Sequence, residues 1–427
     1  MPLLRVKPSK LEGEVTAPPS KSYTHRAFAV GLLAKGKSKI TNPLLSSDTQ
    51  ATIDAVKILG AKVTQRDDVW HTVGTGGDLK PSKNLIDVKN SGTTLRLMSA
   101  IASLSPKPIG LTGDESIRAR PMDPLIKTLA KLGAEARCDG PRGRPPVVVG
   151  GRLKGGDVEI SASISSQFVS ALLFACPYAR EDVELQVTEL RSKPYVEMTL
   201  ELLDLADANI KRSSDLTEFT IPGRQVFRPL EFDVPGDFSS AAFLLGAAAL
   251  SGAAVKVENL DIRGAQGDKK IIDLLREFGA EVKVRGKVIE VSSSGLTGIE
   301  VNCRDNPDLV PVLAVLGTVA DGRTVLMDIP HLRYKETDRI RALRSELSKM
   351  GAKVEELPGE LRIRGVKQLK GMKLNSYGDH RMAMAFAVAG LVAKGETIVD
   401  GAECISVSYP GFVEDMRKLG AQMELMG

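Results

Sequence analysis

The chain has 427 residues, of which 42% are hydrophobic and 26% are charged, which is typical of a globular protein long enough for two or three domains. The net charge of +5 favours an anionic partner, but the basic residues form no long blocks and the chain has only one Trp and six Tyr, which argues against a nucleic-acid-binding protein. The longest apolar runs, residues 241–250 and 382–393, are shorter than the about 20 residues that span a bilayer, so no membrane segment is expected.

The cysteines and the N-terminus indicate a cytoplasmic protein. The four cysteines lie far apart and form no CxxC pair, which is typical of reduced thiols rather than of disulfides or a zinc site. They are Cys138, Cys176, Cys303 and Cys404. The first residues lack the apolar core of a signal peptide.

A repeated pattern organises the whole chain. A helix-like stretch ends in Gly-Ala and is followed by a strand-like stretch, and this happens at Gly60, Gly133, Gly279, Gly351 and Gly420. A degenerate copy at Asp207 fills the one gap, so that successive marks are 73, 74, 72, 72 and 69 residues apart. A fixed period of this kind indicates one supersecondary unit used six times. Glycine suits the left-handed C-terminus of a helix.

Each repeat is expected to contain the same elements in the same order. A polar cluster precedes an apolar helix, at residues 27–34, 95–104, 168–175, 241–250, 309–319 and 382–393. A short strand, a second polar cluster, an amphipathic helix and further strands follow, as at 281–284 and 288–291. The alternation of helices and strands predicts an α/β protein with two domains of three repeats and a seam near Arg228. The leading segment 3–15 could pair with either half.

The polar clusters that open the repeats lie where a helix begins, and helix N-termini attract anions. Three of them also carry Lys or Arg, and a cation at that end opposes the helix dipole, so an anion there would offset it. These three clusters are residues 20–26, 90–96 and 378–381. The plain alternative is that Ser, Asp and Asn simply cap the helices, and this is the reading favoured for residues 237–240.

The second-phase clusters, at residues 118–121, 191–195 and 333–339, are also basic. In the last of them, Lys335 and Arg339 are four residues apart and are expected to share one helix face. A solvated, salt-bridged helix is the alternative to a binding site.

Two carboxylates are candidates for acid and base. Asp308 lies at a helix start, and Glu336 lies between Lys335 and Arg339, where neighbouring charges could tune its proton affinity. The alternatives are that Asp308 only caps its helix and that Glu336 only pairs with a cation.

Other motifs do not predict a cofactor or metal. Residues 31–38 match the GxxxxGK[ST] phosphate-loop pattern, but that loop needs a preceding strand and a following helix, whereas a helix precedes and a strand follows here. The four His residues have no metal-ligand spacing.

Five of these motifs, in order and in register, strongly resemble the 5-enolpyruvylshikimate-3-phosphate synthase family. They are Pro19-Ser20-Lys21-Ser22 with His25-Arg26, Asn90-Ser91-Gly92-Thr93 with Arg96, Ser165-Ser166-Gln167, Lys335-Glu336-Thr337-Asp338-Arg339 and Asp379-His380-Arg381-Met382. The resemblance implies a monomer of two domains, residues 16–228 and residues 1–15 with 229–427, each built from three βαβαββ units with helices inside and sheets outside. It implies an active site in the cleft between them, without cofactor or metal.

The implied reaction transfers the carboxyvinyl group of phosphoenolpyruvate to the 5-hydroxyl of shikimate 3-phosphate and releases phosphate. The resemblance implies that Asp308 is the base, that Glu336 is the acid and that Lys21 assists. The residues that would bind shikimate 3-phosphate are Lys21, Ser22, Arg26, Ser165, Ser166, Gln167, Ser192, Tyr195, Asp308 and Lys335. Those that would bind phosphoenolpyruvate are Lys21, Gly92, Arg120, Gln167, Arg339 and Arg381, with Asn90, Thr93, Arg96 and His380 in support.

The chain departs from a common pattern of this family at Leu97, His331 and Val407. The nearest rival is the sister transferase that acts on UDP-N-acetylglucosamine, which often carries a reactive Cys in the loop equivalent to residues 114–120, where this chain has none. An RNA-binding or RNA-end-processing protein is a further alternative, against which the dispersed charge and the few aromatic residues argue. An inactive anion-binding protein is another, but it would not need both Asp308 and Glu336.

Overall fold

The computed structural model describes residues 2–426 and divides into two compact units. Unit 2 is Pro19–Val234, and unit 1 combines the residues up to Pro18 with those from Pro235 onward. The divisions therefore fall slightly after the expected positions 15 and 228. The reason at the second division is that strand β14 (Glu231–Asp233) still pairs with β3 (Lys37–Thr41) of unit 2.

The six apolar helices and the six second helices alternate along the chain as expected. The apolar helices are α1 (Lys21–Leu33), α3 (Gly92–Ala102), α6 (Gln167–Ala175), α8 (Phe238–Ser251), α10 (Val310–Val319) and α12 (His380–Gly390). The second helices are α2 (Ser47–Ile58), α5 (Asp123–Lys131), α7 (Lys193–Leu205), α9 (Ile271–Glu277), α11 (Arg339–Lys349) and α13 (Phe412–Lys418), and a short α4 (Glu115–Arg118) precedes α5. Short 3-10 turns are η1 (Cys176–Tyr178), η2 (Gly267–Lys270), η3 (Pro330–Tyr334) and η4 (Ala402–Val407).

Each repeat contributes one four-stranded sheet that mixes parallel and antiparallel pairs. In unit 2 the sheets are β14-β3-β5-β4, β6-β7-β9-β8 and β10-β11-β13-β12. Their other strands are β4 (Lys62–Arg66), β5 (Val69–Val73), β6 (Leu85–Asp87), β7 (Ile109–Thr112), β8 (Glu135–Gly140), β9 (Arg144–Gly150), β10 (Gly156–Ser161), β11 (Val183–Thr188), β12 (Lys211–Arg212) and β13 (Glu218–Ile221).

In unit 1 the four-stranded sheets are β16-β17-β15-β2, β18-β19-β21-β20 and β23-β25-β1-β26, and β22-β24 is a small two-stranded pair. The strands are β1 (Leu3–Lys7), β2 (Gly13–Thr16), β15 (Val255–Glu258), β16 (Glu281–Arg285), β17 (Val288–Ser292), β18 (Glu300–Asn302), β19 (Arg323–Met327), β20 (Lys353–Leu357), β21 (Glu360–Arg364), β22 (Leu369–Lys370), β23 (Lys373–Asn375), β24 (Ala393–Lys394), β25 (Thr397–Asp400) and β26 (Gln422–Met426).

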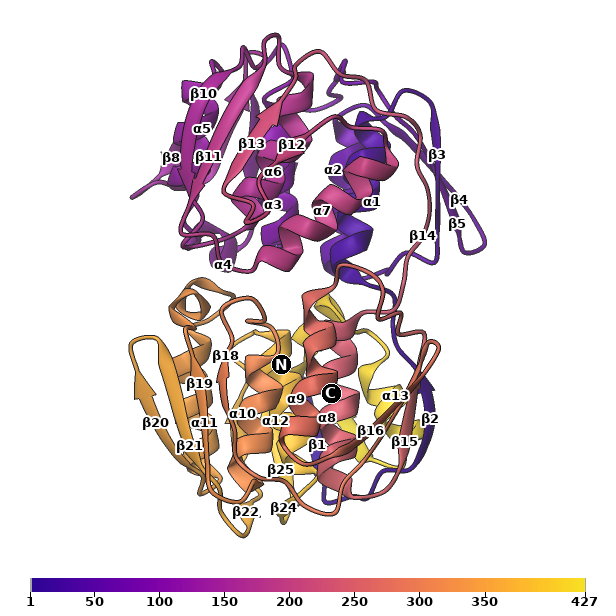
Figure 1. Ribbon diagram of the computed structural model, residues 1–427, viewed down its shortest axis with the longest axis vertical. Coiled ribbons are helices and arrows are strands. Elements are labelled where there is room, and N and C mark those ends of the chain that lie inside the picture. The colour runs from indigo at the N-terminus through magenta and orange to yellow at the C-terminus, as the bar shows by residue number, and fades with distance from the viewer. Residues whose placement is uncertain (1, 427) are drawn as a thin grey trace. The chain divides into compact units, whose positions relative to one another are not determined.

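The apolar helices form the interior of each unit because they have no polar face to present to water. In unit 1, α8, α10 and α12 pack against one another, and in Figure 1 they lie inside that unit with its strands toward the periphery. Helix α10 is buried along Val310–Thr318. The expected α/β class, with helices inside and sheets outside, is confirmed.

The N-terminal segment pairs with unit 1 only. Strand β1 lies between β25 and β26, and β2 runs parallel to β15 at the edge of the fourth repeat's sheet. The alternative in which this segment pairs with the other half is thereby resolved. The strand β14 has the corresponding role for the first repeat's sheet.

The helix ends show why Asp207 can replace glycine in the degenerate repeat. The five glycine marks all have positive φ, between 89° at Gly133 and 115° at Gly60, and Asp207 has the same left-handed sense at 65°. Aspartate is one of the few residues with a side chain that tolerates this region. The segment 31–38 begins in the last turn of α1 and ends in β3, so it has no phosphate-loop context. No helix within residues 2–426 is both long enough and apolar enough to cross a bilayer.

The packing of α8 on α10 gives a test of this interior. A Cβ on Gly246 would lie 2.4 Å from Cγ2 of Val312. We expect Gly246→Ala to lower the free energy of unfolding by about 1–3 kcal/mol through overpacking, although alanine favours helix by about 1 kcal/mol over glycine.

Urea unfolding of Gly246→Ala, Val312→Ala and the double variant would measure this contact. The double variant should be more stable than the sum of the two single changes. Simple additivity of the two would show that the helices do not touch in this way.

Candidate functional site in each unit

A buried arginine organises the predicted acid–base residues of unit 1. Arg339 is 1% exposed and stands at the first position of α11. Its Nε donates to Asp379, one terminal nitrogen donates to Asp308 and the other donates to Glu336, each over 2.8 Å. The carboxylates come from the starts of α10 and α12 and from the turn before α11. Three separate chain segments, two from the fifth repeat and one from the sixth, are thus joined through one side chain.

Asp308 bridges two arginines rather than capping its helix. Its second oxygen lies 3.0 Å from the guanidinium of Arg381, and the ammonium of Lys335 lies 3.9 Å from the first. The N-cap position of α10 is Leu309, and no side chain caps that helix. The alternative in which Asp308 is only an N-cap is therefore wrong.

The prediction that Lys335 and Arg339 share one helix face is also wrong. Helix α11 begins only at Arg339, because Asp338 caps it by accepting from the backbone N–H of Arg341. Lys335 has an extended backbone after the turn η3. The two cations nevertheless both approach Asp308.

The charges of this cluster shift the proton affinities of its cations in opposite directions. Burial alone would lower the pKa of Arg339, but the carboxylates of Asp379, Glu336 and Asp308 outweigh burial and hold that pKa above its usual value. Burial lowers the pKa of Lys335; the negative charge of Asp308 opposes this effect, and the positive charge of Arg339 adds to it. Arg339 is thus a permanent cation, whereas Lys335 gives up its proton more readily than an exposed lysine.

A fourth carboxylate, Asp268, lies behind this cluster and was not predicted. It accepts a hydrogen bond from the hydroxyl of Ser239 at 2.5 Å and one from the amide of Asn306 at 3.3 Å. Burial and the negative charge of Asp308 raise its pKa to about 6. Arg381, which pairs with Asp308, also donates weakly to the carbonyl of Ser239, over 3.4 Å. Asp268 and Asp308 are therefore connected through Ser239 and Arg381.

The predicted anion-binding residues of unit 2 include a second buried arginine with a different environment. Arg26 is 1% exposed, and its hydrogen bonds go to Thr199 Oγ1 and to the carbonyls of Ser22 and Tyr195, over 2.8 to 2.9 Å. Burial lowers its pKa to about 10. All three of these acceptors are neutral oxygens, so they orient the guanidinium without cancelling its charge, as an anion site requires.

Two further predicted cations of unit 2 are held near helix starts. Lys21, the first residue of α1, forms a 3.1 Å ion pair with Asp48, which lies in the first turn of α2. Arg120 is buried against Gly92, the first residue of α3, where an added Cβ would lie 2.3 Å from a guanidinium nitrogen. Only glycine at position 92 allows this close approach.

The predicted Gln167 links two repeats of unit 2. Its amide oxygen accepts from Arg96 at 2.6 Å, and its amide nitrogen donates to Thr93 at 2.9 Å. The guanidinium of Arg96 also lies 5.4 Å from the ring centre of Phe168. The start of α6 and the first turns of α3 therefore form one polar group.

Two of the predicted serines do not use their hydroxyls to cap a helix. Ser166 and Ser192 occupy the N-cap positions of α6 and α7, but neither side chain caps its helix. Ser165 accepts from the backbone N–H of Gln167 over 3.3 Å. Ser170, one turn into α6, donates to the carbonyl of Tyr195, which brings the two helix starts together. Simple capping does not account for Ser166 and Ser192.

The remaining predicted residues and the family departures take ordinary positions. Asn90 is half-buried before α3, and His380 is buried as the first residue of α12. Leu97 belongs to the core of α3, His331 is buried in η3, and Val407 is half-buried at the end of η4. No group of three or more His, Cys, Asp or Glu side chains in the described part of the chain could hold a metal ion.

The residues that sequence reasoning missed share one signal. Asp48 and Asp268 both lie just before or within the start of the second helix of their repeats, α2 and α9. This is the phase at which the basic clusters of the other repeats were found. Searching that phase for acids as well as for bases would have identified both.

The two clusters supply complementary chemistry. Unit 2 presents cations and hydroxyls suited to phosphate and carboxylate groups. Unit 1 presents carboxylates beside fixed cations, which suits proton transfer and the stabilisation of developing negative charge.

Comparisons with known proteins agree with this chemistry. A family model described as EPSP synthase (3-phosphoshikimate 1-carboxyvinyltransferase) matches residues 6–416. A 3-phosphoshikimate 1-carboxyvinyltransferase of Methanothrix thermoacetophila is 49% identical, and one of Methanocaldococcus jannaschii is 46% identical, with 99% of each chain covered in both cases.

Solved structures show the same fold. An EPSP synthase from Acinetobacter baumannii superposes with a TM-score of 0.83 at 27% identity, covering 100% of both chains. The enolpyruvyl transferase NikO from Streptomyces tendae, at 19% identity and a TM-score of 0.81, is similar in fold.

The burial of Asp268 predicts a pH-dependent difference in stability. A raised pKa favours the neutral carboxyl in the folded state, so its contribution is present below about pH 4 and is lost as pH rises through about 6. We expect Asp268→Asn to gain stability relative to the parent chain over that window, on the order of 2 kcal/mol.

Urea unfolding from about pH 4 to pH 7 would measure it. Asp273→Asn, at an exposed position of α9, is the matched control for the change from carboxylate to amide. A constant difference between Asp268→Asn and the parent chain across this range would contradict the assignment.

Proposed function

This chain belongs to the EPSP synthase family, and we propose that it transfers the carboxyvinyl group of phosphoenolpyruvate to the 5-hydroxyl of shikimate 3-phosphate, releasing phosphate. The names of the relatives favour this substrate over UDP-N-acetylglucosamine. The structural observation that carries the proposal is the junction at Arg339, where Asp308 and Glu336 share one buried guanidinium. Such a pair of carboxylates is what an addition followed by an elimination requires.

In the proposed addition step, the oxygen of the 5-hydroxyl bonds to C2 of phosphoenolpyruvate while Asp308 takes the proton of that hydroxyl. Glu336, assisted by Lys21, delivers a proton to C3, which gives a tetrahedral adduct. In the elimination step Glu336, now a carboxylate, takes a proton back from C3 and the C2–O bond to phosphate breaks, which restores the double bond and releases phosphate. Arg339 and Arg381 already lie beside Asp308 and offset the negative charge that develops.

In the proposed binding roles, cationic and hydroxyl side chains take the carboxylate and phosphate groups of the substrates. Arg26 and Ser22 take the shikimate carboxylate, Ser165, Ser166 and Ser192 take its phosphate, and Gln167, Tyr195 and Lys335 border the ring. Phosphoenolpyruvate is assigned to Lys21, Gly92, Arg120, Gln167, Arg339 and Arg381. The support for these roles in unit 2 is that Arg26 is oriented only by neutral oxygens and that Ser166 and Ser192 do not cap their helices.

We further propose that the protein acts as a monomer in the cytoplasm. The reduced, widely separated cysteines support the compartment. Size-exclusion chromatography with light scattering would test the oligomeric state.

The primary test is phosphate release from phosphoenolpyruvate with shikimate 3-phosphate or UDP-N-acetylglucosamine supplied separately. Release with shikimate 3-phosphate alone is expected. Release with the nucleotide sugar alone would overturn the proposal and its binding assignments.

Asp308→Asn should lower kcat by about 10²–10⁴-fold, because the amide keeps the shape but cannot accept the hydroxyl proton. Shikimate 3-phosphate should still bind with an affinity close to that of the parent chain, as measured by calorimetry. Asp305→Asn, in the same loop, is the control for local disturbance. An equal loss of binding and turnover in Asp308→Asn would contradict its role as base.

Lys21→Met should raise KM for phosphoenolpyruvate and lower kcat, because an ammonium group that offsets substrate charge is removed. The change also breaks the ion pair with Asp48, so the double variant with Asp48→Asn is the control for stability. Unchanged steady-state kinetics in Lys21→Met would remove this lysine from the site.

A further inference from the structure

The outer face of one sheet in unit 1 carries an unusual row of charge. The sheet is β18-β19-β21-β20, and helices α10 and α11 pack against it. Lys353 on β20 pairs in register with Arg364 on β21, which pairs with Arg323 on β19. All three residues are exposed. Three cations therefore lie side by side across adjacent strands that are about 4.8 Å apart, an arrangement that destabilises the sheet by repulsion.

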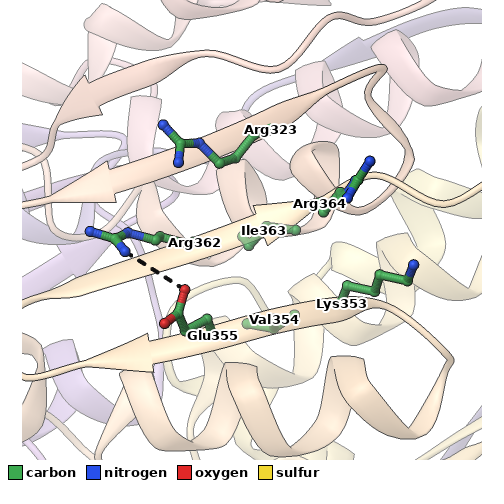
Figure 2. Close-up of a pocket in the computed structure, with 7 residues that line it drawn as sticks. All are labelled: Arg323, Lys353, Val354, Glu355, Arg362, Ile363 and Arg364. Atoms are coloured by element: carbon green, nitrogen blue, oxygen red, sulfur yellow. Dashed lines mark ion pairs between the residues drawn. The ribbon is translucent and has the colours of Figure 1, made fainter.

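Neighbouring acids compensate only part of this charge. Arg323 donates to Glu300 over 2.8 Å, and Arg362 pairs with Glu360 and Glu355. Within residues 2–426, neither Lys353 nor Arg364 has a carboxylate within 4.0 Å. Figure 2 shows both of them toward one end of their strands, with the Arg362–Glu355 pair toward the other. The uncompensated charge is thus concentrated at one place.

The other repeats provide an internal comparison, because they use the same strand arrangement. In the fourth repeat the residues at the positions of Lys353 and Arg364 are Glu281 and Ser292, which are hydrogen-bonded. In the sixth repeat they are Gln422 and Lys7, and Lys7 pairs with Glu396.

The first repeat also separates its charges. There Lys62 and Lys37 flank an apolar Val73 in the same row. The fold therefore does not require three adjacent cations, and their presence in the fifth repeat needs its own explanation.

The row borders a hollow of about 390 Å³ on the sheet. Its lining residues are Arg323, Lys353, Val354, Glu355, Arg362, Ile363 and Arg364. This hollow is separate from the catalytic cluster of unit 1. Asp308 and Arg339 lie at the starts of α10 and α11, whereas Arg323 and Lys353 follow the ends of those helices. Helices of 10 and 11 residues span about 15 Å.

We propose that this row is a binding site for a small anion that contains two or more linked phosphate groups. Arg364 presents a planar fork suited to phosphate oxygens, and Lys353 and Arg323 are its register partners on the two neighbouring strands, with Cα positions that span about 10 Å, twice the strand spacing. A single exposed ion pair contributes little, so a ligand must engage several cations at once. The hollow has no aromatic side chain on which a base could stack, and Glu355 borders it, which disfavours single-stranded nucleic acid and acidic peptides.

Calorimetric titration of the full chain at low salt, with inorganic tripolyphosphate as the probe, would test this site. The double variant Lys353→Glu with Arg364→Ser reproduces the fourth repeat and should bind at least ten-fold more weakly. The single variant Arg364→Gln should also bind more weakly, and it retains most of the side-chain volume. Lys62→Glu removes a cation at the matching position of the first repeat and should bind as the parent chain does.

The proposal does not depend on the enzymatic function, because the readout is binding and each variant leaves the catalytic residues intact. Affinity for ATP equal to that for tripolyphosphate would identify the phosphate chain as the ligand, and tighter binding of ATP would identify a nucleotide. Both outcomes support the site.

Equal affinity in the parent chain and in the double variant would overturn the proposal, as would no binding to the parent chain. Tighter binding of a DNA oligonucleotide or of polyglutamate than of tripolyphosphate would overturn it too. Thermal unfolding of each variant confirms that the fold is retained before binding is compared.

Discussion

The organisation of unit 1 depends on one buried guanidinium. Arg339 donates hydrogen bonds to three carboxylates from separate chain segments. Burying each of those carboxylates without this partner would cost free energy. Since Asp308, Glu336 and Asp379 sit at or next to the starts of three helices, the same contacts that neutralise charge also fix where those helices begin. Structure and chemistry are thus coupled at this residue, and neither can be altered there alone.

The two units treat their buried charges in opposite ways. In unit 1 the buried cations lie close to carboxylates, and burial together with the negative charge of Asp308 raises the pKa of Asp268. In unit 2, Arg26 is surrounded by neutral oxygens and keeps its full charge. We infer that unit 2 is organised to receive anions and unit 1 to exchange protons, which fits a reaction between two phosphorylated acids.

Much of this arrangement could be predicted because it depends on local sequence. The Gly-Ala marks located the ends of the second helices, and the left-handed Asp207 shows that even the degenerate copy obeys the same backbone rule. The apolar helices were evident because they lack a polar face. The residue pattern singled out Asp308 and Glu336, the family resemblance assigned Arg339 to phosphoenolpyruvate, and the structure brings these three side chains together.

What could not be predicted depends on contacts between distant segments. Lys335 was expected on a helix face, but the capping of α11 by Asp338 shortens that helix, and spacing alone does not reveal this. Asp48 and Asp268 lie at a repeat phase that was searched only for basic residues, and their partners Lys21 and Ser239 come from distant parts of the chain. Likewise, a row formed by Lys353, Arg364 and Arg323 exists only once the register of three strands is known.

The placement of β1 and β2 affects how the chain can be synthesised and folded. Unit 2 is continuous, so all of its partners are available once Val234 has been made. Strand β2 must wait for β15, and β1 must wait for β25 and β26 at the far end of the chain. During translation the residues of β1 and β2 therefore lack their strand partners while unit 2 can already fold. We expect the closing of so long a loop to slow the completion of unit 1.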